Sequence, residues 1–190
     1  MKKLSKILIL VVSAALLVTA SVLGTLAYLT NTTEKVTNTF TIGNVKISLD
    51  ETDVDVNGVK DGDTRVTGNE YKLIPSREYI KDPIIHVEEG SEACWVFIAL
   101  KNGLGDAATF SFNGDMWDEI GETEAGVIYA YKTTLSAGES TKALFETFTF
   151  DGSANPADYE DATIDLIGYA VQAEGFGSAE AAWAAGFGNN

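Results

Sequence analysis

The sequence has a single cysteine, Cys94, so the chain cannot form a disulfide bond within itself. Cys94 lies in the apolar run Ala93–Leu100, and this neighbourhood predicts a buried thiol that behaves as a small hydrophobic side chain. We therefore expect the hydrophobic core, rather than disulfide bonds, to stabilise the fold.

The sequence also has only one histidine, His86, and no HExxH motif. A catalytic zinc site usually takes three protein ligands, often two or three histidines, and a general base. In a strand, His86 and Glu88 would share one face while Glu89 would lie on the other, which leaves at most a weak metal site. There is no GxSxG motif and no GxxxxGK[ST] phosphate loop, and a buried Cys94 would be a poor nucleophile. These absences predict that the protein is not an enzyme.

Basic residues are few: 13 Lys and Arg stand against 28 Asp and Glu, for a formal net charge of −15. Such a chain repels nucleic acid and anionic membrane surfaces, so neither is an expected partner. The acids are spread along the chain rather than gathered in a tail, which is typical of the charged surface of a folded domain.

Long apolar runs are absent except near the N-terminus, where residues 7–23 follow Lys2, Lys3 and Lys6. Small residues at Thr25 and Ala27 complete the pattern of a secretory signal peptide, and we expect cleavage between Ala27 and Tyr28. Residues 28–190 then form a single secreted domain, which touches the membrane only through the uncleaved signal peptide. The alternative is an uncleaved anchor, although the run is slightly shorter than the roughly 20 residues that span a bilayer.

The remainder reads mostly as short strands separated by turns. Residues 94–100 are apolar without alternation, which predicts a central strand that is buried on both faces. The strand-like segments are residues 40–49, 83–87, 94–100, 109–112, 127–131, 143–150 and 164–173, and residues 53–60 are expected to form a short hairpin. This number and spacing predict an all-β fold, an antiparallel jelly-roll β-sandwich.

One or two short helices are expected in the C-terminal part. Residues 156–162 could form one or two turns, and residues 178–185 have Ser178 as an N-cap and Gly186 as a closing residue. The dipeptide Asn57-Gly58 predicts a hairpin with a type I′ turn.

The start of the chain resembles the TasA/camelysin family of Gram-positive exported proteins. The resemblance rests on Gly24–Thr30 and Thr39–Leu49, and weaker similarities occur at Lys81–Pro83, Ala93–Phe97 and Tyr169–Ala173. It implies a leader that a SipW-type signal peptidase removes, a jelly-roll fold, and a role as a subunit of a cell-surface or biofilm-matrix fibre.

The resemblance also implies that the freed N-terminal segment, residues 28–39, is donated as a strand to the next subunit. A sheet edge can accept such a strand, and a head-to-tail contact that does not close produces a filament. The side chains expected to enter the neighbour are Leu29, Val36, Phe40 and Ile42. The alternative is a polar lead-in over residues 28–38, with Phe40 beginning an ordinary strand of the same chain.

A second feature of the chain is the acidic stretch Asp53–Thr64, which matches part of an EF-hand loop. The predicted ligands of a weak calcium site are Asp53, Asp55, Asn57 and Asp61. Thr64 stands where the bidentate glutamate belongs, and Lys60 adds a positive charge. The alternative is therefore a hairpin whose acids are solvated, and no cofactor is required in either case.

Two further functions stay open. Trp95, Trp117 and Trp183 would bind sugars if they shared an exposed face, so a surface adhesin or other binding module that does not polymerise is the first alternative. The second is a metallopeptidase, because camelysin-type members have been described as such.

Overall fold

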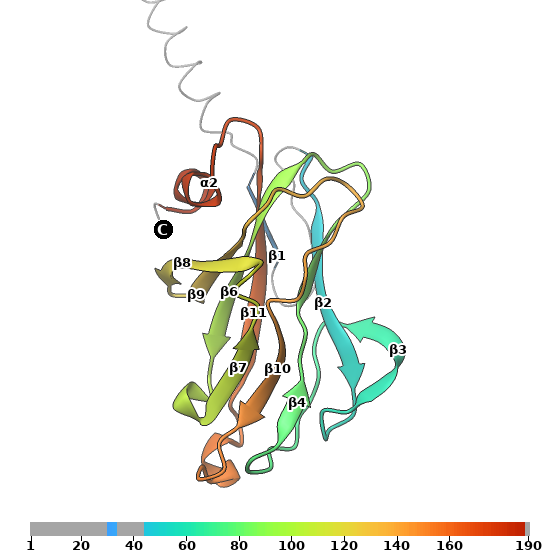
Figure 1. The fold of residues 1–190 in the computed structure, drawn as a ribbon, viewed down its shortest axis with the longest axis vertical. Helices are drawn as coiled ribbons and strands as arrows, with labels where there is room; N and C mark the ends of the chain where they lie inside the picture. Colours follow the sequence, from blue (N-terminus) through green and yellow to red (C-terminus); the bar gives the residue numbers. More distant parts are fainter. Residues whose placement is uncertain (1–29, 34–43, 189–190) are drawn as a thin grey trace, which may run out of the picture.

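The computed structural model describes residues 30–33 and 44–188, and antiparallel strands dominate this part of the chain (Figure 1). The largest sheet has the order β1-β11-β6-β9-β8, and two smaller sheets have the orders β4-β10-β7 and β3-β2-β5. The strands are β1 (Thr30–Thr33), β2 (Ile47–Val54), β3 (Lys60–Val66), β4 (Glu78–Ile80), β5 (Ile84–Val87), β6 (Cys94–Asn102), β7 (Ala108–Phe112), β8 (Trp117–Thr123), β9 (Gly126–Tyr131), β10 (Phe145–Phe150) and β11 (Ile164–Gln172).

Strand β6 lies at the centre of the five-stranded sheet, between β11 and β9. Its side chains alternate between two hydrophobic clusters: Val96 and Ile98 belong to the main core, and Phe97 belongs to a second core on the opposite face. A strand that is covered on both faces needs apolar side chains at successive positions. The prediction of a central buried strand over residues 94–100 is therefore confirmed.

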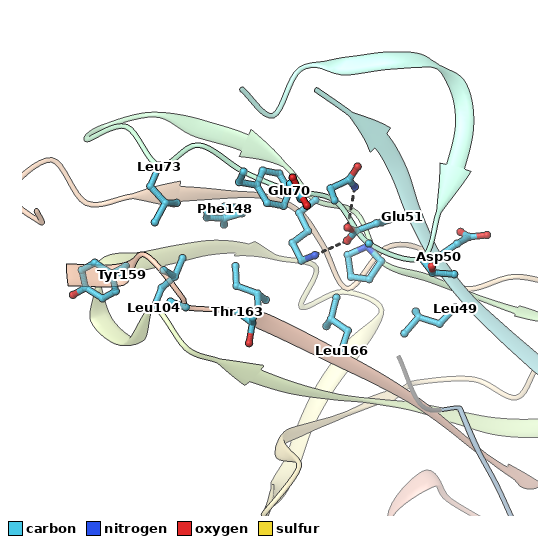
Figure 2. Close-up of a pocket in the computed structure, with 18 of the residues that line it drawn as sticks. Leu49, Asp50, Glu51, Glu70, Leu73, Leu104, Phe148, Tyr159, Thr163 and Leu166 are labelled. Carbon is cyan, nitrogen blue, oxygen red and sulfur yellow. Dashed lines mark hydrogen bonds and ion pairs between the residues drawn. The ribbon is translucent and has the colours of Figure 1, made fainter. Parts of the chain in front are cut away.

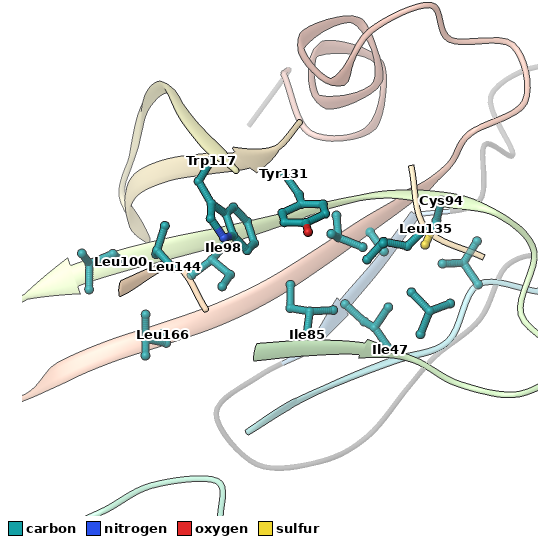
Figure 3. Close-up of a cluster of buried hydrophobic side chains, with 14 of the residues drawn as sticks. Ile47, Ile85, Cys94, Ile98, Leu100, Trp117, Tyr131, Leu135, Leu144 and Leu166 are labelled. Atoms are coloured by element: carbon teal, nitrogen blue, oxygen red, sulfur yellow. The ribbon is translucent and has the colours of Figure 1, made fainter. Parts of the chain in front are cut away.

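The main core lies between the five-stranded sheet and the layer that contains β2 and β5 (Figure 3). Ile47 and Ile85 come from this layer, and they pack in one cluster with Ile98 and Leu166 of the large sheet. Each fully buried side chain of this kind contributes roughly 1.5–3 kcal/mol through the apolar surface that it removes from water. This burial holds the two layers together.

The second core lies between the large sheet and α2 (Ala179–Gly186). The Ser178 side chain accepts a hydrogen bond from the backbone N–H of Ala181, so the predicted N-cap is confirmed. From the helix, Trp183 contacts the rings of Phe97 and Tyr169. The helix thus covers the face of the sheet that the second layer leaves open.

The hairpin between β2 and β3 is where it was predicted, but its turn is not type I′. That type needs a positive φ at both central residues, whereas in this turn only Gly58 has one, of 74°. The Asp55 carboxylate accepts hydrogen bonds from the backbone N–H groups of Asn57 and Val59, at 2.9 and 3.0 Å. These bonds favour a turn over Asp55–Gly58. The Gly58 N–H closes this turn by donating a hydrogen bond to the Asp55 carbonyl oxygen.

The predicted antiparallel all-β class is confirmed, with one α-helix in the described C-terminal part. The other predicted helix is a single 3₁₀ turn, η2 (Pro156–Tyr159). A second short 3₁₀ helix, η1 (Gly105–Ala107), strands β4 and β8, and residues 61–66 of β3 were not predicted. No helix in the described part of the chain has the length and hydrophobicity needed to span a bilayer.

Candidate functional site

The N-terminal strand β1 forms one edge of the five-stranded sheet (Figure 1). It pairs antiparallel with β11, with Thr30 opposite Val171 and Thr33 opposite Gly168. The other edge of β11 pairs with β6, so among the described strands β11 alone holds β1 in the sheet. Such pairing depends on main-chain hydrogen bonds, which a strand of almost any sequence can supply.

A cavity of about 860 Å³ is lined by residues of both layers, and of β11 it includes Ile164 and Leu166, which precede the residues that pair with β1. Its wall combines residues of β2, β10 and β11 with the loop after β3 and the η2 turn. Figure 2 shows Leu73 and Phe148 on one side of the cavity, across from Leu104 and Leu166. The volume lies in the range of ligand-binding pockets. The lining combines apolar side chains, which suit a hydrophobic side chain or ligand, with charged ones. We call this cavity the groove.

A buried ion pair forms part of the groove wall. Lys81 Nζ lies 2.6 Å from Glu51 Oε2, and the two residues are only 5% and 3% exposed. The other carboxylate oxygen of Glu51 accepts a hydrogen bond from the side-chain amide of Asn69. Burial, with the negative charge of Glu51, raises the pKa of the nearby Tyr71 phenol. The cluster is charged yet closed to solvent, an arrangement that is costly unless its polar atoms are paired.

Sequence reasoning missed this cluster, although one signal for it exists. Ile47, Leu49 and Glu51 occupy alternate positions of β2, and alternate positions of a strand face the same side. A carboxylate in register with two apolar side chains predicts a buried acid that needs a partner. No spacing rule connects it with Lys81 or Asn69, because those residues come from other segments.

His86 does not lie among metal ligands. Its Nδ1 is 2.7 Å from Ser140 Oγ and its Nε2 is 3.0 Å from Asp50 Oδ1, so the only histidine joins three segments. Asp50 also forms an ion pair with Arg65. Neither His86 nor Ser140 lines the groove, and no group of three His, Cys, Asp or Glu side chains suited to a metal occurs in the described ranges.

The residues of the predicted calcium site lie in and around the β2–β3 hairpin. Asp55 accepts the turn N–H groups, and the Val59 N–H and the Asn57 side chain lower the pKa of its carboxyl group. Asp53 accepts a hydrogen bond from the Thr64 hydroxyl, and Asp61 is exposed on β3. Binding of calcium to these residues stays a prediction.

The buried thiol is confirmed, because Cys94 is free, fully enclosed and has a pKa that burial raises to about 12. The three tryptophans do not share an exposed face. Trp117 is buried in the main core, whereas Trp95 and Trp183 pack against the second core. The structure therefore gives no support to a sugar platform built from all three.

The predicted cleavage site, Ala27 and Tyr28, lies outside the described residues, as do the predicted assembly residues Leu29, Val36, Phe40 and Ile42. Of the predicted donor segment 28–39, only Thr30–Thr33 is described, and it pairs with β11 of its own chain. The extent of the domain and the identity of the assembly residues stay predictions.

The described residues define an antiparallel β-protein with an N-terminal edge strand and a groove lined by both apolar and charged side chains. Residues 2–74 match the model of the Camelysin metallo-endopeptidase family, so the resemblance to the TasA/camelysin family is confirmed over this stretch. The matched stretch contains β1, β2 and β3. Comparison with curated proteins and with solved structures gives no match.

Proposed function

We propose that this protein is a secreted structural subunit of a cell-surface or biofilm-matrix fibre, and that it assembles by donating its N-terminal strand. The observation that carries the proposal is the pairing of Thr30–Thr33 with residues 168–171 of β11. This strand begins only a few residues after the predicted cleavage site. Cleavage would release it from the membrane.

The same ladder can form between two copies of the chain. If β11 of one subunit accepts residues 30–33 of the next, the backbone hydrogen bonds are equivalent to those within one chain. The accepting subunit keeps its own strand free for a further neighbour. The contact is therefore head-to-tail, and such contacts build a filament when the rotation between successive subunits does not close a ring.

The groove supports this assembly, because Ile164 and Leu166 of β11, the strand that receives the donated segment, belong to its lining. A jelly-roll sandwich, which the family resemblance implies, would keep the two layers rigid around it. The assembly needs no cofactor, and calcium would act only through the acidic hairpin. The expected partners are further copies of the chain and a SipW-type signal peptidase.

Electron microscopy and sedimentation of chains 28–190 and 40–190 test the proposal. We expect filaments from the longer chain and monomers from the shorter one. A synthetic peptide of residues 28–39 should bind the shorter chain, whereas a scrambled peptide of the same composition should not. If both chains stay monomeric over a wide range of concentration, salt and calcium, and the peptide does not bind, strand donation is wrong.

The family match also requires a test for peptidase activity, because the matched model is described as a metallo-endopeptidase. Casein cleavage that a chelator abolishes, together with bound metal, would support this second function. Loss of cleavage in His86→Ala would place the only histidine in the site. A monomeric, inactive chain would instead direct the search to ligands of a surface binding module.

A further inference from the structure

A nucleophile, a proton-transfer group and an amide meet in one buried cluster of this fold. Lys81 Nζ lies 2.6 Å from Glu51 Oε2, and Asn69 Nδ2 donates a hydrogen bond of 2.9 Å to Glu51 Oε1. The amine and the carboxamide thus share a single carboxylate. Both contacts are drawn as dashed lines to Glu51 in Figure 2.

The carboxamide of Asn69 is oriented by the backbone as well. Its Oδ1 accepts the N–H of Val54 at 3.0 Å, while its Nδ2 also donates to the carbonyl oxygen of Thr52 at 2.9 Å. A fixed N–H donor on an amide oxygen withdraws electron density from the carbonyl carbon. The same donor stabilises the negative charge that develops on that oxygen when a nucleophile attacks.

The Lys81 amine and the Glu51 carboxylate touch each other away from bulk water, because both residues are almost fully buried. A low dielectric makes separated charges costly, so transfer of a proton from an ammonium group to a touching carboxylate is easier here than in water. The product of that transfer is an uncharged amine, which is a nucleophile.

We propose that Lys81 and Asn69 join in an intramolecular isopeptide bond, with Glu51 as the group that transfers the protons. Glu51 takes a proton from the Lys81 ammonium group, and the free amine attacks Cγ of Asn69. The tetrahedral intermediate carries its charge on Oδ1, facing the Val54 N–H. Glu51 passes its proton to Nδ2, the Cγ–Nδ2 bond breaks, and ammonia is released. The attacking nitrogen gives its extra proton to the regenerated Glu51 carboxylate, and that proton departs with the ammonia as ammonium. The net change is one amine plus one primary amide to one secondary amide plus ammonia, with no oxidant, reductant or cofactor.

The other lysine ion pairs within residues 44–188 lack these features. Lys60 with Asp63 and Lys132 with Asp118 are both exposed pairs, and neither pair has an amide on the second carboxylate oxygen.

The proposed bond would close a loop from residue 69 to residue 81, which includes groove-lining Tyr71 and Leu73. It would fix this wall covalently in a chain that has one cysteine and hence no internal disulfide. The proposal does not depend on fibre formation.

Peptide mapping of the full chain, purified after folding and then denatured, tests the bond. Trypsin cuts after free lysine, but not after a lysine whose amine is acylated. We expect residues 66–72 to be recovered in one covalent species with residues 78–101, with no cut after Lys81. Its mass should equal the sum of the two peptides less one ammonia, and fragmentation should place the link between Asn69 and Lys81.

Three variants assign the roles. Lys81→Arg keeps the positive charge beside Glu51 but removes the nucleophile, so it should release free peptide 66–72. Glu51→Gln keeps the shape of the side chain but cannot accept a proton, and should also lose the link. Lys72→Arg is the matched control, because this lysine lines the groove without contacting Glu51, and it should keep the link.

Complete cleavage after Lys81 in the wild-type chain, with free peptide 66–72 in full yield, would overturn the proposal and leave an ordinary buried ion pair. A link that survives in Glu51→Gln would overturn the role of Glu51. The wild-type map decides the main claim even if a variant fails to fold.

Discussion

The surroundings of two residues, Asp55 and Cys94, shift their pKa values in opposite directions. Asp55 is exposed, and its carboxylate receives hydrogen bonds from backbone N–H groups of its own turn, which lower its pKa. Cys94 has an apolar environment, and burial raises the pKa of its thiol. In each case the shift follows from whether the surroundings stabilise the charged form.

We expect Cys94 to resist alkylation by iodoacetamide at pH 8 in the folded protein. Its pKa of about 12 makes the reactive thiolate scarce, and the side chain is closed to solvent. Unfolding in guanidinium should speed the reaction at least about 100-fold, because both obstacles disappear. Mass spectrometry of the alkylated fraction over time measures this, and equal rates in both states would contradict it.

Asp55 should make the β2–β3 hairpin sensitive to acid. Because its pKa is lower in the folded state, the ionised carboxylate stabilises the fold above its unfolded pKa of about 3.9, and this contribution disappears as the pH falls through the folded value. Asp55→Ala should lower the melting temperature at pH 7, and less so at pH 2. Asp61→Ala, on the exposed part of β3, is the control and should leave the melting temperature nearly unchanged at either pH. Identical shifts for the two variants would argue against the turn hydrogen bonds.

At the scale of elements, the β8–β9 hairpin depends on one glycine. Gly126 has a φ of +118°, and a Cβ at this position would overlap the backbone carbonyl oxygen of Leu100 in β6. Only a residue without a side chain lets the hairpin pack this closely against the central strand.

Gly126→Ala should therefore destabilise the protein by at least about 2 kcal/mol, through backbone strain and displacement of β6. Chemical denaturation followed by tryptophan fluorescence provides the measurement. Gly114→Ala is a suitable control, since nothing lies within 4 Å of a Cβ there. If Gly126→Ala lowers the free energy of unfolding no more than Gly114→Ala does, the hairpin accommodates the added methyl group without strain.

Strands, helices and turns could be predicted from the sequence when neighbouring residues determine them, and not when contacts with distant residues do. The central strand and the capped helix were predicted, because apolar continuity and a serine N-cap are readable along the chain. Strand β8 was missed, since Asp118, Glu119 and Glu122 give it no apolar alternation and its register shifts between Glu119 and Gly121. The turn type was wrong, because the preference of Asn57-Gly58 yielded to the hydrogen bonds of Asp55.

At the scale of the whole molecule, charge should control the proposed assembly. Chain 28–190 lacks Lys2, Lys3 and Lys6, so its 10 Lys and Arg against 28 Asp and Glu give a formal net charge of −18, and its subunits repel one another. At 0.1 M salt this repulsion is screened beyond about 10 Å. We therefore expect filaments of chain 28–190 to grow faster in 0.5 M than in 0.05 M sodium chloride, as followed by light scattering. Sucrose of equal osmolality is the control and should have little effect. Slower growth at high salt would indicate that attraction between opposite charges, rather than strand pairing, holds the subunits.

The sequence by itself determined the antiparallel β class, the acidic surface, the buried thiol and the N-terminal resemblance. Each of these follows from composition or from the order of neighbouring residues, which can be read along the chain. Only the tertiary structure decided which distant side chains meet. It placed Asn69 and Lys81 on the two oxygens of Glu51, and Thr30–Thr33 beside β11. Those contacts depend on how separate strands pack into layers, and a linear pattern does not encode distances between residues that far apart in the chain.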